Sequence, residues 1–130
     1  MTQEQLNRRL FQAAYNNDID LGREAIKAGA DVHSRNIDAD TPLLLACGWG
    51  HTETAKILIE AGADVNATGL QENAALHFAA RWGYTELAKL LIEKGADVNA
   101  RDTDDRTPLR IAVIYKNTEI VELLKQHGGV

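Results

Sequence analysis

The sequence lacks long apolar segments, paired cysteines and clustered basic residues, and each absence excludes a class of protein. No run approaches the roughly 18 apolar residues that a transmembrane helix requires, so no membrane partner is expected. The single cysteine, Cys47, cannot form an intramolecular disulfide, and the polar start of the chain predicts no secretory signal. The 14 Lys and Arg residues lie scattered among 19 Asp and Glu, which argues against nucleic acid as a partner. These absences predict a soluble, cytoplasmic protein.

A repeated motif organises the whole chain. The string Gly-Ala-Asp-Val begins at Gly29, Gly62 and Gly95, and Gly128 follows at the same interval. Repetition with a period of about 33 residues indicates stacked structural units. We therefore expect one domain, residues 1–130, built from four units. The unit boundaries lie at approximately 1–35, 36–68, 69–101 and 102–130.

Each unit has the pattern of two short helices separated by a turn. Thr41 and Thr107 suit the capping position before a first helix, and the proline after each suits the first helical position. The second helices are predicted to begin at Thr52, Thr85 and Thr118. In the third unit Ala74-Ala75 replaces Thr-Pro, so Asn73 is expected to cap that helix instead.

The helix pairs must stack on one another, because a two-helix unit of this size cannot bury its apolar face alone. The outer units carry polar residues where the inner units are apolar: Gln12 in the first and Lys125 in the last. This is the pattern expected at the ends of an array. Thr2 and Gln5 are predicted to form a capping box at the start of the first helix.

These motifs closely resemble those of ankyrin repeats. The likeness is carried by Thr41-Pro42-Leu43, Ala46, Gly50-His51, Gly62–Ala67, Leu76-His77, Ala79-Ala80, Gly83 and Gly95–Ala100. The resemblance implies an all-α fold, an ankyrin-repeat solenoid of four helix-turn-helix repeats joined by β-hairpin-like turns. The sequence departs from the family at the turn tips, where Ala39, Glu72 and Asp105 replace the usual glycine, so the tip geometry is open.

Groups that could carry catalysis are few. Ser34, the single serine, has no base placed to activate it. Cys47 and His51 are four residues apart, but Cys47 occupies the position of a small core residue and is interpreted as one. The four histidines show no metal-ligand spacing. We therefore expect no enzyme, no metal site and no cofactor.

The turn tips differ most between the two inner units. Residues 36–68 and 69–101 are identical at 17 of 33 positions, yet their first seven positions all differ. Such variation fits either a recognition surface on a fixed scaffold or the ordinary drift of exposed loops. The candidate partner-binding residues, from the tips and the first helices, are Ile37, Asp38, Asp40, Trp49, Leu70, Gln71, Asn73, Arg81, Trp82, Thr103, Asp104, Arg106 and Tyr115.

A row of aromatic residues is predicted on one face of the array. Trp49, Trp82 and Tyr115 recur at the interval of the repeat, with Asn16 at the same position in the first unit. Stacking aligns them, and in ankyrin arrays this position lines the concave face of the first helices. The rings could form a partly exposed binding row, or each could pack against its neighbour's helix.

The resemblance implies a non-catalytic module that binds another protein through its tips and concave face. Acidic residues outnumber basic ones in the tips, which gives a weak preference for a basic partner segment. We expect the module itself to be a monomer. The alternatives are a structural or engineered scaffold with no evolved partner, and an inhibitor of an enzyme.

Overall fold

The computed structural model describes residues 1–130 as an all-α protein, as the sequence predicted. It contains eight α-helices and one short 3-10 helix, η1, at Leu70–Glu72. The α-helices are α1 (Gln3–Asn16), α2 (Ile19–Lys27), α3 (Pro42–Gly48), α4 (Thr52–Glu60), α5 (Ala75–Trp82), α6 (Thr85–Glu93), α7 (Pro108–Ile114) and α8 (Thr118–Gln126).

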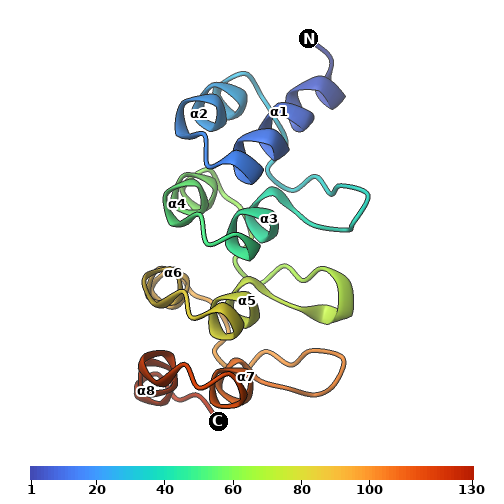
Figure 1. The fold of residues 1–130 in the computed structure, drawn as a ribbon. Coiled ribbons are helices and arrows are strands. Elements are labelled where there is room, and N and C mark those ends of the chain that lie inside the picture. Colours follow the sequence, from blue (N-terminus) through green and yellow to red (C-terminus); the bar gives the residue numbers. More distant parts are fainter.

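The helices form two parallel columns (Figure 1). One column contains the first helix of each unit, α1, α3, α5 and α7, and the other contains α2, α4, α6 and α8. Three long connections project from the side of the first column (Figure 1). We call their ends the tips, residues 36–40, 69–73 and 102–106. The shape is that of a solenoid in which each helix pair packs on the next.

Each tip closes like a hairpin, as predicted. The backbone N–H of the first tip residue donates to the carbonyl of the fifth, at 3.0 Å, 3.0 Å and 3.1 Å in chain order. Ala39, Glu72 and Asp105 have φ of 62°, 55° and 60°, a left-handed conformation that suits glycine better. The tips therefore keep the turn without its usual glycine.

Side-chain caps explain where most first helices begin. Thr41 Oγ1 accepts from the N–H of Leu44 at 3.1 Å, and Thr107 repeats this contact in the last unit. The capping box of Thr2 and Gln5 is also confirmed. These caps satisfy amide groups that the helix leaves without partners.

The predicted cap of α5 is wrong. The capping residue is Ala74, which has no side-chain oxygen to offer. Asn73 instead donates from Nδ2 to the carbonyl of Leu70, 3.3 Å away within its own tip. His77 reaches back, and its Nδ1 accepts from the N–H of Ala74 at 3.1 Å. The helix start is thus held by a side chain from inside the helix.

Small residues let successive units approach closely. Ala14, Cys47 and Ala80 occupy the same position in the first three units and are fully buried. A Cβ atom at Gly22 would lie 3.0 Å from Cδ1 of Ile57, so a side chain at this site in α2 would crowd the next unit. Cys47 is therefore a small core residue, as interpreted from the sequence.

Candidate binding surface

The tips and the exposed faces of the first helices together form what we call the front surface. It begins at the tips and extends along the first helices to their C-terminal ends. We call Trp49, Trp82 and Tyr115, at those ends, the aromatic row. Leu45 and Phe78 lie between the row and the tips, each half-buried against the core.

The side chains of the aromatic row are about half exposed. The exposed fractions are 54% for Trp49, 58% for Trp82 and 46% for Tyr115. Of the two alternatives left by the sequence, packing within the array would have buried these rings. The structure leaves them accessible from solvent.

The rings do not touch one another along the row. Trp49 packs edge-to-face against Tyr15 of α1, with ring centroids 5.4 Å apart. Tyr15 is thus the aromatic neighbour of Trp49 in the first unit, where Asn16 occupies the position of the row. At the other end, the Arg81 guanidinium lies 5.3 Å from the ring centroid of Tyr115, and Nη1 is 3.3 Å from the hydroxyl. Trp82 has no ring neighbour on either side.

The tips present two apolar side chains in equivalent positions. Ile37 is 100% exposed and Leu70 is 64% exposed, and Thr103 occupies the same place in the last tip. Gln71 is also exposed, and its carbonyl accepts from the N–H of Thr103 at 3.0 Å, which joins the last two tips. Asn73 is buried and offers a partner little surface.

The acidic side chains of the first two tips have no basic partner. Asp38, Asp40 and Glu72 form no ion pair. Burial, and then repulsion from Asp38, raises the pKa of the Asp40 carboxyl, although Arg35 opposes the shift. Arg35 itself donates to the carbonyls of Ala39 and Thr68, at 2.7 Å and 2.8 Å.

The last tip pairs its charges internally, in a network that sequence analysis missed. Asp102 is buried, and its carboxylate accepts from the N–H of Asp104 and from the N–H and Nε of Arg106. Burial alone would raise the pKa of Asp102, but these hydrogen bonds outweigh it and hold the pKa below its usual value. Arg106 also pairs with Asp104, at 3.2 Å. Asn36, at the equivalent position two units earlier, accepts from two backbone N–H groups of its own tip in the same way. The 33-residue repeat aligns Asn36 with Asp102, and this alignment could have revealed the role of Asp102 from the sequence.

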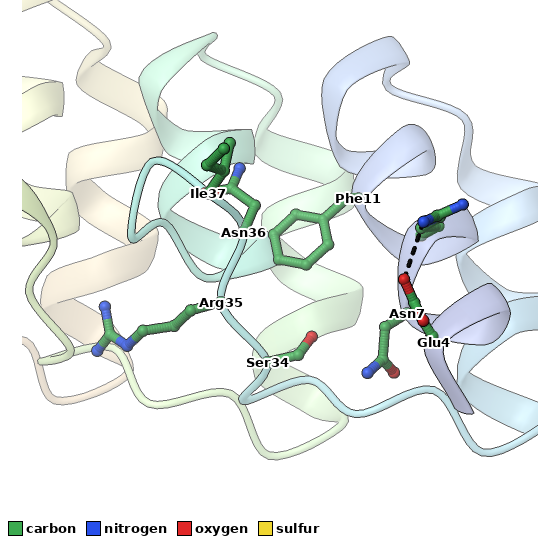
Figure 2. A pocket seen from close by; sticks show the side chains of 8 residues that line it. Glu4, Asn7, Phe11, Ser34, Arg35, Asn36 and Ile37 are labelled. Carbon is green, nitrogen blue, oxygen red and sulfur yellow. Dashed lines mark hydrogen bonds and ion pairs between the residues drawn. The ribbon is translucent and has the colours of Figure 1, made fainter. Parts of the chain in front are cut away.

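A cavity of about 710 Å³ lies between α1 and the first tip (Figure 2). Its lining residues are Glu4, Asn7, Arg8, Phe11, Ser34, Arg35, Asn36 and Ile37. Figure 2 shows the Phe11 ring between the tip and α1, while Arg35 points away from it. Of these residues, sequence analysis named Ile37 alone as a candidate binding residue, because the cavity forms between two units and has no motif of its own.

Groups that could support other chemistry are engaged in the fold. Burial raises the pKa of the Cys47 thiol, and Ser34 Oγ donates to the carbonyl of Asp31 at 2.7 Å. The Nε2 of His51 lies 3.1 Å from the carbonyl of Tyr15. No group of three or more His, Cys, Asp or Glu side chains is placed to hold a metal ion. No helix is both long and apolar enough to cross a membrane.

Comparison with known proteins agrees with this architecture. A family model described as ankyrin repeats (3 copies) matches residues 10–102 and 72–130. Two ankyrin repeat proteins of Rickettsia felis are each 35% identical over 54 residues. The matched segment covers 42% of this chain and 86% and 82% of the two relatives.

Proposed function

The chain belongs to the ankyrin-repeat family, and from this premise we propose that it is a non-catalytic module that binds another protein through the front surface. Ankyrin repeats are generally protein–protein interaction modules, and the family is generally non-catalytic. In this proposal, residues 1–130 form one domain, and the protein acts as a monomer in the cytoplasm. The unpaired acids of the first two tips favour a partner with basic residues there.

The exposure of the aromatic row is the observation that carries the proposal. Trp82 keeps 58% of its surface accessible and has no ring neighbour, so it contributes less to folding than a buried tryptophan would. Tryptophan and tyrosine are enriched among the residues that dominate binding energy at protein interfaces. A large, part-exposed ring at the middle of the row therefore fits a binding anchor.

The substitution Trp82→Ala tests this function. Capture of a partner from a lysate should weaken by about 30-fold or more, the affinity equivalent of roughly 2 kcal/mol at an interface anchor. The free energy of unfolding should fall by only about 1 kcal/mol, because the ring is part-exposed. Circular dichroism during urea titration measures the second quantity.

Lys56→Ala serves as the control, since Lys56 is exposed on α4 in the other column. It should leave both capture and stability unchanged. The function is contradicted if Trp82→Ala binds the captured partner as tightly as the unchanged protein. A stability loss of about 3–5 kcal/mol would instead indicate that Trp82 is a core residue.

A further inference from the structure

We propose that the front surface binds an extended polyproline II segment of its partner, with an apolar residue at every third position and a basic residue in the triplets that lie beside the first two tips. The inference rests on the proposed function, because it specifies the conformation and the sequence pattern of what that surface binds. It follows from the spacing of the aromatic row, the exposure of its rings and the charge of the tips.

The spacing of the row matches one turn of a polyproline II helix. Packed helices lie about 8–10 Å apart, so Trp49, Trp82 and Tyr115 advance by about that distance per unit. A polyproline II helix rises about 3.1 Å per residue with three residues per turn, or about 9 Å per turn. A β-strand repeats its facing side chains about every 6.6 Å and would lose register within two units. Only the first conformation places one side chain of each turn beside one unit.

The exposed parts of the rings provide apolar surface for those side chains. Trp82 makes no ring contact with Trp49 or Tyr115, and all three rings are about half exposed. The half-buried side chains of Leu45 and Phe78 lie beside the row and give the surface an apolar base. Proline or a small aliphatic residue packs well against exposed aromatic rings, and a preformed polyproline II helix loses little entropy on binding.

The tips supply the complementary charge. Three residues per turn give the segment three faces, so if one face lies on the aromatic row, a second can face the tips and the third is left to solvent. Asp38, Asp40 and Glu72 lie in the first two tips without an ion pair of their own. A lysine or arginine on that second face would give these carboxylates the partner that the fold does not.

A pair of synthetic peptides tests the register. The first contains three Pro-Lys-Ala triplets, about nine residues, which spans about three units. The second has the same composition in an order that breaks the period of three for both proline and lysine. Both tryptophans of the chain, Trp49 and Trp82, lie in the aromatic row, so their emission reports binding directly. Calorimetry gives the affinities of variants that lack one of them.

We expect the periodic peptide to bind at least ten-fold more tightly than its shuffled counterpart. Trp82→Ala should lose at least ten-fold of that affinity, and the double variant Asp38→Asn/Asp40→Asn should lose several-fold together with part of the salt dependence. The matched control Glu53→Gln/Glu60→Gln makes the same charge change at exposed positions of α4 and should change nothing.

Equal affinity for the two peptides, or binding of neither, would overturn the inference. So would sedimentation showing a dimer in which the tryptophans are protected from quencher, because the occupant would then be a second copy of the chain. The peptide experiment and the Trp82→Ala capture experiment test the inference and the proposed function independently. If a captured protein partner still depends on Trp82 while the periodic peptide does not bind, the surface binds a partner of another shape.

Discussion

A side-chain bridge that joins successive connecting turns is missing at one place in the array, and restoring it should stabilise the protein. Asn66 Nδ2 donates to the carbonyl of Gly95 at 3.2 Å, and its Oδ1 accepts from the N–H of Asp97 at 2.7 Å. Asn99 bridges to the last turn in the same way. The corresponding residue one unit earlier is His33.

His33 does not make this bridge. Its side chain is exposed and forms no hydrogen bond, and the N–H of Asp64, which the bridge would reach, has no partner in the chain. The substitution His33→Asn should add the two hydrogen bonds seen at Asn66. A net hydrogen bond contributes about 0.5–1.5 kcal/mol, and exposure places these two at the low end, so we expect a gain of about 1 kcal/mol. That corresponds to a rise in Tm of about 3–5 °C for a domain of this size.

Urea and thermal unfolding followed by circular dichroism measure the gain. Asn66→Ala should lose about the amount that His33→Asn gains, because it removes the same pair of bonds. His33→Ala is the control and should be neutral, since no bond is lost. If Asn66→Ala destabilises the protein while His33→Asn leaves the midpoint unchanged, the two positions are not equivalent and the reasoning fails.

Two further predictions concern the start of α5. Ala74→Thr should raise the free energy of unfolding by about 1 kcal/mol, because it supplies the missing capping oxygen, and urea titration would contradict this if the midpoint did not rise. Burial lowers the pKa of His77 below its ordinary 6.5, so the unfolded chain takes up the proton first and stability should decline as the pH drops below about 6.5. His77→Leu removes this group, so the difference in unfolding midpoint between about pH 7.5 and about pH 5.5 should shrink; an unchanged difference would show that His77 does not cause it.

The scaffold was predictable because its signals are local and repeated. Thr41 followed by proline defines a helix start through its own hydroxyl, and nothing from another unit is needed. The start of α5 was mispredicted because its cap is not in the preceding residues. His77 serves two neighbours at once: it accepts from Ala74 and lies 2.9 Å from the carbonyl of Arg106 in the next tip. A contact between two units cannot be predicted from the sequence of one unit alone.

The shape of the middle tip was not predicted either. Gly69 stands where the other tips have Asn36 and Asp102, whose side chains fold those tips. A Cβ atom at Gly69 would lie 3.2 Å from Oδ1 of Asp40 in the neighbouring tip. Glycine offers no side-chain acceptor at this position, and the middle tip contains the short helix η1.

The candidate surface was predictable in position but not in exposure. The interval of the repeat aligns Trp49, Trp82 and Tyr115, but it does not fix the direction of each ring. That direction depends on neighbours such as Tyr15, which packs against Trp49 although it lies one residue away from the expected row. The burial of a side chain depends on how the units pack together. Whether the three rings lie in the core or on the surface therefore could not be decided from the sequence alone.

Variation among the tips is informative only where folding leaves the residue free. Asn36 and Asp102 differ, yet each must offer an oxygen that accepts from two backbone N–H groups of its tip. Only residues with an acceptor oxygen suit this position. The difference between Asn36 and Asp102 therefore says little about which partner the tips bind. The side chain of Ile37 has no such structural role, because it is fully exposed and contributes nothing to the core. A fully exposed isoleucine brings apolar surface into water without stabilising the fold, and Leu70 does much the same one unit later. Contact with a partner would bury the apolar side chains of Ile37 and Leu70, which the folded chain leaves exposed to water.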